Sequence, residues 1–541
     1  MSSGDGVAPA PGLDLDLRSR QEARDRAVAA REAQRAFAGA SQEQTDRVCA
    51  AMAQAACAAA PRLARLAQEE TGYGVAHHKE VKDTFASRDV WASIAEVPTV
   101  GVLHRDTARG ITDIGWPVGV IAALTPSTNP TSTAMFKILI AVKARNAVIV
   151  APHPAARRCS AETVRVMAEA GEAAGMPRGL VACLEHVSLA GSQELMGHYA
   201  TSLILATGGP GMVRAAHSTG KPAIGVGPGN VPVWVDRSAD VGKAARDLVD
   251  SKAFDSSVIC ATEQTVVADA PIAGELRAAM ADHGAHWVDA AGSEALARAL
   301  FRPDGAIEPA AVGKTPQQLA DLAGIAVPAH ARILVADLAG VGRAHPLSRE
   351  KLTTVLGFLV ADGWRAGCER AIELLRFGGD GHSLVIHARD EEVVDAFGLE
   401  KPAFRIVVNT WGTLGAIGAT TGVMPSMTLA PGGLGGSIVS DNITVHHLLN
   451  IKRVAAETAA PPAQARAPAH ATGAAAADAG GPSAAGGAGG SAGADGLDEA
   501  TVREVVRRVV AALEGGSGGG APTGARGGSG PRRPPASAAR R

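Results

Sequence analysis

One cysteine of the chain stands in a context that suits chemistry. Cys260 lies in FDSSVICATEQTVV (254–267), between a polar turn and a run rich in β-branched residues, so it is expected at the mouth of a secondary-structure element. A thiol reacts as the thiolate, from a partly exposed position. The other cysteines form neither a CxxC pair nor a metal-ligand spacing with histidine: Cys49, Cys57, Cys159, Cys183 and Cys368. A buried cysteine is usually an inert small hydrophobic residue, and the residues alone leave that interpretation open for Cys260.

Three glycine-rich segments could bring the backbone close to a ligand. ATGGPGM (206–212) follows a predicted buried strand and precedes a helical pattern, and a helix N-terminus attracts phosphate. It does not satisfy the GxGxxG fingerprint, so a plain strand–turn–helix junction explains it equally well. GVGPGNVP (225–232) could be a tight turn before a strand, and APGGLGGSIVSDN (430–442) could be a flexible connection.

The elements that must position these segments alternate as in α/β proteins. GVIAALTP (119–126) and NAVIVAPHP (146–154) are predicted strands, and the helical pattern between them completes a βαβ unit with a parallel sheet. LVACL (180–184) and TSLILATGGPG (201–211) continue the alternation, whereas 20–95 has polar, alanine-rich helical spacing. Nucleotide cofactors bind at the carboxyl ends of such strands.

Composition restricts the class of protein. A length of 541 residues predicts two or three domains. The formal net charge of −2 offers no basic excess for a nucleic acid partner. No apolar run approaches the roughly 20 residues that span a membrane, and the N-terminus lacks the features of a secretory signal. With the unpaired cysteines, these features predict a cytoplasmic protein without structural disulfides or metal.

The composition changes sharply near residue 455. Residues 456–494 are almost entirely Ala, Gly, Pro and Ser, which predicts a flexible linker. Residues 495–515 predict one amphipathic helix with an apolar stripe formed by Val502, Val505, Val506, Val509, Val510 and Leu513. Such a stripe needs a partner surface. Residues 516–541 are expected to be disordered.

Taken together, the motifs resemble the acylating branch of the aldehyde dehydrogenase superfamily. This branch includes the N-terminal half of bifunctional aldehyde–alcohol dehydrogenases and aldehyde dehydrogenases of bacterial microcompartments. The resemblance covers roughly residues 20–455 and is carried by PVGVIAALTPSTNPTSTAMFK (117–137), NAVIVAPHP (146–154), LILATGGPGMVRAAHSTGKPAIGVGPGN (203–230), FDSSVICATEQ (254–264), EKLTTVLGF (350–358), RIVVNT (405–410) and the segment 426–453.

The resemblance implies an aldehyde dehydrogenase fold. A Rossmann-like cofactor domain is expected at 1–240 with a return segment at 430–455, and an α/β catalytic domain at 241–430. A strand arm within the catalytic domain is expected to join subunits of a homo-oligomer.

The resemblance also implies the catalytic residues. Cys260 matches the nucleophile that attacks the aldehyde to form a thiohemiacetal and then a thioester. Asn129 matches the asparagine whose amide helps to hold the oxyanion beside the Cys260 backbone N–H. A turn-forming Asn before Pro130 is the alternative for Asn129.

Further matches concern the NAD cofactor. Pro152, His153 and Pro154 occupy the turn where hydrolytic relatives place a ribose-binding lysine, which leaves the choice between NAD and NADP open. Glu350 matches the glutamate that binds the nicotinamide ribose, although an ordinary solvated Glu would also fit. The glycine turns supply the other contacts: Thr207, Gly208, Gly209 and Gly227.

One departure from the hydrolytic members predicts the acceptor. They carry a glutamate in the glycine turn ahead of the cysteine, where it activates water. The matching turn here has no acid from Pro222 to Val235. Coenzyme A, whose thiol is a better nucleophile than water, is therefore the expected acceptor. A hydrolytic enzyme that releases the free acid is the alternative.

The tail resembles the encapsulation peptides that direct enzymes into bacterial microcompartments. By this resemblance it would bind shell proteins. Encapsulation would suit a volatile, toxic aldehyde, such as propionaldehyde or acetaldehyde. Alternatively, the helix docks on the protein's own surface, or the chain is a catalytically silent shell-organising protein. A bifunctional aldehyde–alcohol dehydrogenase is not expected, because the linker and tail leave no room for a second enzyme domain.

Overall fold

The computed structural model describes residues 14–462 and residue 465. Residues 14–460 belong to one compact unit. Most of the predicted linker 456–494, the predicted helix 495–515 and the tail 516–541 lie outside the described residues. Within the described part, no helix has the length and apolar character to cross a bilayer. The same residues contain no group of three or more His, Cys, Asp or Glu side chains placed to hold a metal ion.

A five-stranded parallel sheet occupies the first part of the chain, in the order β5-β4-β3-β6-β7. Its strands are β3 (Val120–Thr125), β4 (Ala147–Pro152), β5 (Val181–Cys183), β6 (Thr201–Thr207) and β7 (Ala223–Val226). β3 and β4 are buried at every position, which explains why they occur as continuous apolar runs. The chain moves outward from β3 to β5 and returns on the other side of β3 as β6. The strand order therefore reverses between β3 and β6.

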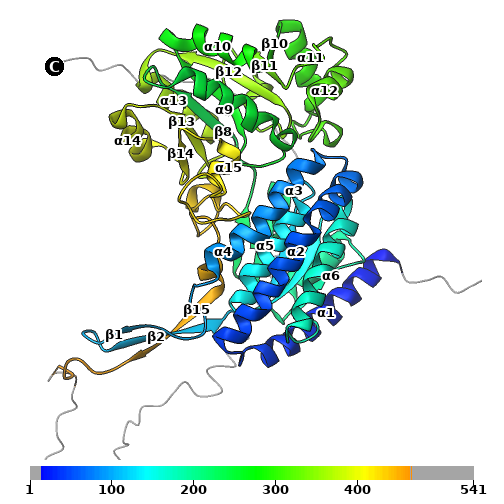
Figure 1. The fold of residues 1–541 in the computed structure, drawn as a ribbon, viewed down its shortest axis with the longest axis vertical. Helices are drawn as coiled ribbons and strands as arrows, with labels where there is room; N and C mark the ends of the chain where they lie inside the picture. The colour runs from blue at the N-terminus through cyan, green and yellow to red at the C-terminus, as the bar shows by residue number, and fades with distance from the viewer. Residues whose placement is uncertain (1–13, 463–464, 466–541) are drawn as a thin grey trace, which may run out of the picture. The chain divides into compact units, whose positions relative to one another are not determined.

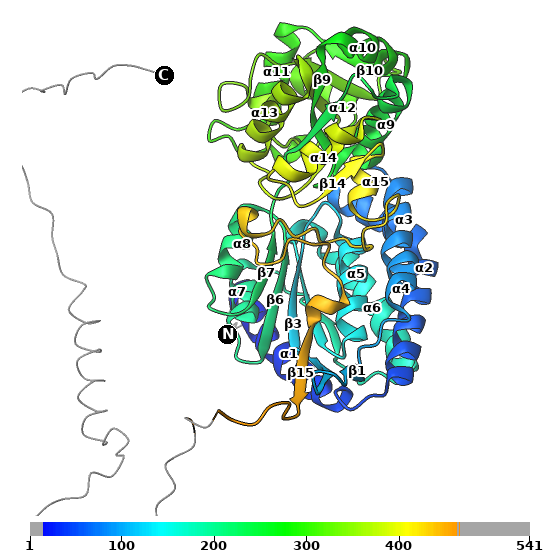
Figure 2. The same cartoon turned by 90° about the vertical axis from the view of Figure 1, so that its left-hand side faces the viewer.

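Helices cover both faces of this sheet, and Figure 2 shows α5 and α6 on one side and α7 and α8 on the other. The helices of this part of the chain are α1 (Leu15–Phe37), α2 (Gln42–Thr71), α3 (Ala76–Thr84), α4 (Val90–Ile94), α5 (Pro130–Lys143), α6 (Arg157–Ala173), α7 (Leu189–Gly197) and α8 (Pro210–His217), with a π-helical turn at Phe85–Asp89. α5 is buried along its whole length, since α2 and α6 cover the side that the sheet does not. The predicted βαβ unit is thus confirmed.

A seven-stranded parallel sheet follows, in the order β10-β11-β12-β9-β8-β13-β14. Its strands are β8 (Val231–Val235), β9 (Glu263–Asp269), β10 (Ala285–Val288), β11 (Ile333–Asp337), β12 (Val355–Ala361), β13 (Leu384–His387) and β14 (Ile406–Val408). Its helices are α9 (Val241–Ala253), α10 (Ala273–Asp282), α11 (Ala290–Leu300), α12 (Pro316–Ala323), α13 (Gly363–Arg376), α14 (Glu391–Glu400) and α15 (Gly412–Ala416). Because β8 pairs with β9 and β13, this sheet begins near residue 231, ahead of the expected boundary at 240.

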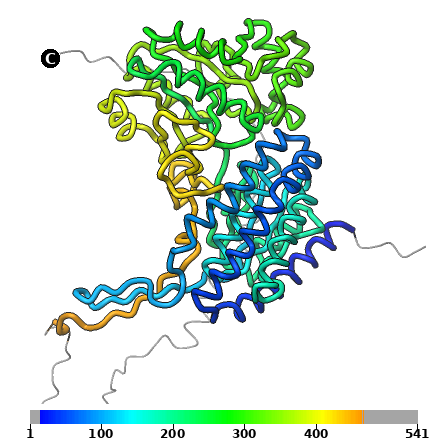
Figure 3. The backbone as a smooth tube through the Cα atoms, in the orientation of Figure 1, coloured from blue at the N-terminus to red at the C-terminus, as the bar shows by residue number. Residues whose placement is uncertain are grey.

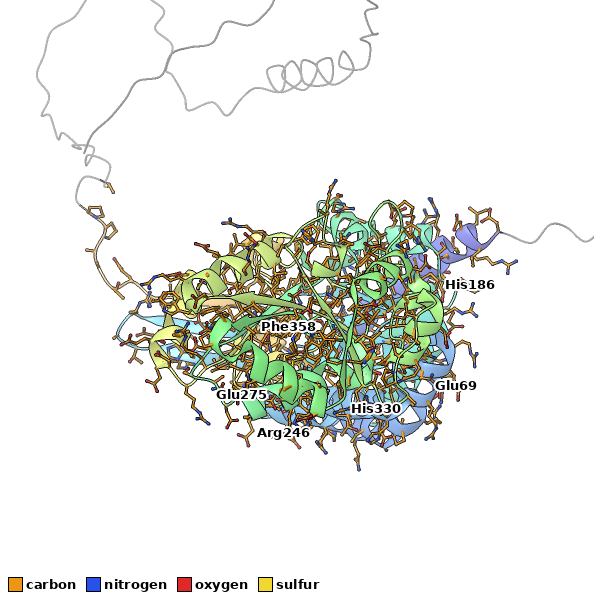
Figure 4. All side chains as sticks on the ribbon, turned by 90° about the horizontal axis from the view of Figure 1, so that it is seen from above. Glu69, His186, Arg246, Glu275, His330 and Phe358 are labelled. Atoms are coloured by element: carbon orange, nitrogen blue, oxygen red, sulfur yellow. The ribbon has the colours of Figure 1, made fainter. Side chains whose placement is uncertain are left out.

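The core is continuous between the two sheets. One cluster of buried apolar side chains extends from the N-terminal helices through both sheets to Leu448. In Figure 4 the labelled Phe358 lies within the dense interior, whereas Glu69 and His186 lie at the periphery. The two sheets therefore hold their adjoining loops in a fixed relation.

A separate three-stranded antiparallel sheet is formed by β1 (Gly101–Asp106), β2 (Ile111–Pro117) and β15 (Leu449–Ala455). Figure 1 shows it projecting beside the helices, and Figure 3 shows the C-terminal strand returning to the N-terminal hairpin. The strand arm was expected within 241–430, and that expectation is wrong. The strands of that segment are used in the buried parallel sheet, so the exposed arm comes from the two flanks of the chain instead.

Candidate active site

The loops at the carboxyl ends of β3 and β6 meet the start of β9 around a cavity of about 400 Å³. These two strands are neighbours where the strand order reverses, the place where open parallel sheets form ligand crevices. The cavity is lined by most of the residues that the sequence predicted for the site: Cys260, Asn129, His153, Thr207, Gly208, Gly209, Gly227 and Glu350. Pro152 and Pro154 do not line it, because one is buried at the end of β4 and the other is exposed. They flank His153 instead.

Cys260 follows a turn with left-handed backbone. Asp255, Ser256 and Ser257 have φ angles of 47°, 49° and 68°. This conformation costs non-glycine residues on the order of 1 kcal/mol each, so the surroundings must hold it in place. The chain reaches β9 only at Glu263, and Cys260 therefore lies on irregular backbone in the cavity wall with its side chain partly exposed.

Two glycines of the 225–232 turn have different tasks. A Cβ on Gly229 would stand 2.3 Å from the carbonyl oxygen of Cys260 and 2.9 Å from Nδ1 of His382. Any side chain there would displace the segment that carries the thiol. A Cβ on Gly227 would meet no atom within 4 Å, so this glycine borders open cavity. One glycine thus permits packing, and the other leaves room for a ligand.

The surroundings of Cys260 favour the neutral thiol over the thiolate. Burial raises the pKa of this thiol to about 12, and the nearby Glu350 carboxylate adds to the rise, whereas the Arg405 guanidinium lowers the pKa. A negative charge near sulfur opposes the thiolate, and a positive one favours it. A cationic ligand in the cavity would therefore increase the fraction of thiolate.

Glu350 lines the cavity from the segment between β11 and β12. Its Oε1 accepts a hydrogen bond of 3.1 Å from the backbone N–H of Gly229. Burial raises the pKa of this carboxyl group to about 7, although the Gly229 bond and the charges of Lys252, Lys351 and Arg349 oppose the rise. Glu350 therefore changes charge near neutral pH, and it is not the ordinary solvated glutamate that the sequence also allowed.

Asn129 stands between β3 and α5, directly before Pro130 at the first position of the helix. Its Nδ2 donates a hydrogen bond of 2.8 Å to the carbonyl oxygen of Val258, two residues before Cys260. Its Oδ1 accepts a hydrogen bond from Lys82 Nζ. The amide is thus fixed beside the Cys260 segment, which a simple turn-forming role would not require.

The turn after β6 has the features of an anion site. Gly209 precedes α8 and provides no side-chain cap. Pro210 has no N–H, and the N–H groups of Met212 and Val213 donate to the carbonyl of Gly209 at 3.0 and 3.2 Å, so the N–H of Gly211 is the one that the first turn leaves for a ligand. A Cβ on Gly209 would meet no atom within 4 Å. Thr207 shares a hydrogen bond of 3.3 Å with Thr428, which holds the turn against the loop just before the return segment. Across the cavity, His153 Nδ1 accepts the N–H of Ala155 at 3.1 Å, and burial lowers the pKa of this imidazole.

Several residues at the site were not predicted from the sequence. His382 is buried, its Nδ1 lies 3.0 Å from Ser383 Oγ, and its Nε2 has no partner among the described residues. Burial lowers the pKa of His382 to about 3, which leaves the ring neutral. Lys79 and Lys82 reach the site from α3. No local signal marks these residues, because each comes to the site through a distant part of the chain.

Replacing Glu350 with Gln should make Cys260 more reactive in the ligand-free protein, because the variant lacks a negative charge that opposes the thiolate. At about pH 9 the rate of Cys260 alkylation by iodoacetamide should rise several-fold. At about pH 6 the difference should shrink, since Glu350 is then protonated in the parent protein. Mass spectrometry of the Cys260 peptide measures the rate, and the exposed Glu275→Gln serves as control. An unchanged or slower rate at high pH would contradict this electrostatic assignment.

Comparison with known proteins places this geometry in a family. The model of the aldehyde dehydrogenase family matches residues 14–293, more than half of the chain. The bifunctional aldehyde-alcohol dehydrogenase of Escherichia coli is 38% identical over 430 residues, which cover 79% of this chain and 48% of that protein. The chain thus spans about half the length of the bifunctional relatives. The acetylating succinate-semialdehyde dehydrogenase of Clostridium kluyveri is 36% identical over 425 residues, covering 79% and 93% of the two chains.

Solved structures agree. An acetylating aldehyde dehydrogenase from Geobacillus thermoglucosidasius superposes with a TM-score of 0.82 at 46% identity, over 83% of this chain and 99% of that chain. The match confirms the α/β fold class and the resemblance to acylating members that the motifs indicated. The chain belongs to the aldehyde dehydrogenase family.

Proposed function

We propose that this protein converts a short-chain aldehyde, NAD⁺ and coenzyme A to acyl-coenzyme A, NADH and a proton, through a thioester on Cys260. The observation that carries the proposal is the shared cavity of Cys260, Asn129 and the glycine turn after β6, beside a turn without acid from Pro222 to Val235. The relatives named above as acetylating support the choice of acceptor. A propionaldehyde dehydrogenase of Rhodopseudomonas palustris, 27% identical with a TM-score of 0.73, holds coenzyme A and an acylated cysteine.

In the first half-reaction the Cys260 thiolate forms a bond to the aldehyde carbon, and the carbonyl electron pair moves onto oxygen. Asn129 Nδ2 and the Cys260 backbone N–H donate toward this oxygen, and loss of one such donor costs roughly 100- to 1000-fold in rate. The carbonyl then re-forms as the aldehyde hydrogen departs with its electron pair. The oxidised nicotinamide, when bound, accepts this hydride. A thioester remains on Cys260.

In the second half-reaction the coenzyme A thiol loses its proton to solvent and its sulfur forms a bond to the thioester carbon. The bond to Cys260 breaks, and the cysteine leaves as thiolate. Water is a poor competitor without a base. Glu350 is the one acid among the residues that line the cavity, and Gly229 occupies one of its oxygens. We assign Glu350 to the nicotinamide ribose. If it activated water instead, the enzyme would be hydrolytic.

The residues present suit a dinucleotide. The start of α8 offers the backbone N–H of Gly211 and the positive end of the helix to a pyrophosphate, and the open space at Gly209 lets it approach. Thr207, Gly208 and His153 border the same space. Among the described residues that line the cavity there is no lysine or arginine to meet a 2′-phosphate, which favours NAD over NADP.

The cavity also suits a small aldehyde, because its wall beside Cys260 is apolar: Ile259, Ile307, Val312, Leu352, Met427 and Leu429. We favour propionaldehyde or acetaldehyde. We further propose that residues 495–515, which lie outside the described residues, bind shell proteins of a bacterial microcompartment. Support comes from their apolar stripe and from a propionaldehyde dehydrogenase of a Clostridium phytofermentans microcompartment, 29% identical with a TM-score of 0.73.

Sustained NADH formation from propionaldehyde and NAD⁺ should require coenzyme A. Without it, formation should stop after one NADH per Cys260, because the thioester has no acceptor. Cys260→Ala should form none, whereas Cys57→Ala, which removes another partly exposed thiol, should retain activity. Equal turnover without coenzyme A would show that water resolves the thioester. No NADH under any condition would favour a catalytically silent protein.

Deleting residues 495–515 should leave kcat in solution unchanged but abolish co-purification with microcompartment shells. A shortened linker that keeps 495–515 is the matched control, and size-exclusion chromatography follows the oligomer. If the deletion dissociates the oligomer, the helix docks on the protein itself and the shell proposal is wrong.

A further inference from the structure

Helix α3 presents three side chains to the turn that precedes Cys260. Positions 79 and 82 are three residues apart and share one face of the helix. His78 Nδ1 accepts the backbone N–H of Asp255 at 2.9 Å. Lys79 Nζ donates to Asp255 Oδ2 at 3.2 Å and to the carbonyl oxygen of Thr128 at 3.1 Å. Lys82 Nζ donates to the same Asp255 Oδ2 and, in addition, to Asn129 Oδ1.

The two lysines form a matched pair. Their side chains are 2% and 1% exposed, and that of Asp255 is fully buried. Each ammonium group contacts the same carboxylate oxygen, so the removal of either leaves Asp255 with one cationic partner. Between them, Lys82 is the lysine that contacts the Asn129 side chain. An effect that acts through the Asn129 amide should therefore appear when Lys82 is replaced and not when Lys79 is replaced.

The partners of Asn129 fix the orientation of its amide. Lys82 can only donate, so the atom facing it must be Oδ1. The carbonyl of Val258 can only accept, so the atom facing it must be Nδ2. The second hydrogen of Nδ2 has only a long contact of 3.4 Å with Thr128 Oγ1. This hydrogen is the one left for a ligand in the cavity that Asn129 lines.

We propose that Lys82 is a positioning residue for the reaction, which orients and polarises the Asn129 amide so that Nδ2 donates to the oxyanion formed when Cys260 attacks an aldehyde. This inference rests on the proposed function. An ammonium group on Oδ1 draws electron density from the amide and makes its N–H a stronger donor, and the effect is large where water is excluded. Lys82 also links the amide to the Cys260 turn through Asp255. This link helps to fix the position of Asn129 Nδ2 relative to the Cys260 sulfur.

The charge of Lys82 is available at neutral pH. Burial lowers the pKa of its ammonium group to about 8, against the attraction of Asp255, while Lys79 lowers it further and Asp83 raises it. The alternative is that Lys82 only neutralises Asp255 and supports the turn. That role is shared by Lys79, and it predicts equal effects for the two lysines.

The test compares Lys82→Met with Lys79→Met in the full-length chain, by kcat for NADH formation and by alkylation of Cys260. Iodoacetamide reacts at a saturated carbon and creates no oxyanion. We expect Lys82→Met to lower kcat by roughly 10- to 100-fold with the KM for NAD⁺ and the alkylation rate unchanged. Lys79→Met should lower kcat by less than about threefold. The kcat of Lys82→Gln, which keeps an N–H donor without the charge, should lie between those of Lys82→Met and Lys79→Met.

A double-mutant comparison locates the effect. In an Asn129→Ala background, Lys82→Met should lower kcat little further, because the amide through which Lys82 acts is absent. Equal losses in the two lysine variants, a parallel fall in alkylation, or full additivity with Asn129→Ala would overturn the proposal. If Lys82→Met does not fold, the same criteria apply to Lys82→Gln. Absent turnover in the parent protein would refute the proposed function itself, whereas parent turnover with an unaffected Lys82→Met refutes only this inference.

Discussion

The buried carboxylate of Asp255 holds the site together. Its Oδ1 accepts the Val75 N–H at 2.6 Å, and its Oδ2 receives both Lys79 and Lys82. Burial alone would raise the pKa of Asp255, but the two ammonium groups outweigh it and hold the pKa below its ordinary value. A buried charge is tolerated only when paired, and breaking such a pair costs about 3–5 kcal/mol. The left-handed turn, α3 and the Asn129 loop therefore depend on one another.

The protonation state of the Cys260 thiol, in contrast to the fixed contacts of Asp255, depends on the charges around it. The thiol of Cys260 lies in the cavity wall, where desolvation and the nearby Glu350 raise its pKa and Arg405 only partly compensates, so the neutral form is favoured. A neutral thiol resists alkylation and oxidation, which follow thiolate character. The positive charge of an oxidised nicotinamide would shift this balance toward the thiolate. Under the proposed function, binding of the cofactor would thereby favour the Cys260 thiolate, without a dedicated base in the glycine turn.

The features that could be predicted from the sequence are those that a local pattern of residues encodes. Apolar runs and glycine turns located β3, β4 and β6, and the reversal of strand order explains why Asn129 and Thr207 meet. Lys79 and Lys82 could not be predicted, because AHHKEVKDT reads as a polar surface helix until the Asp255 turn packs on it. His382 and Arg405 reach Cys260 across more than a hundred residues of chain, which no spacing rule reveals. The exposed arm was misplaced because its strands come from opposite flanks of the chain.

Trapping the acyl-enzyme would show whether Cys260 carries a thioester that coenzyme A resolves and water does not. The protein is mixed with propionaldehyde and NAD⁺ without coenzyme A, quenched in acid, digested and analysed by mass spectrometry. We expect one propionyl group on the peptide that contains Cys260. This group should persist in water and should disappear when coenzyme A is added before the quench. A Cys260 peptide that stays unmodified while NADH accumulates, or an acyl group that water removes as fast as coenzyme A does, would contradict this expectation.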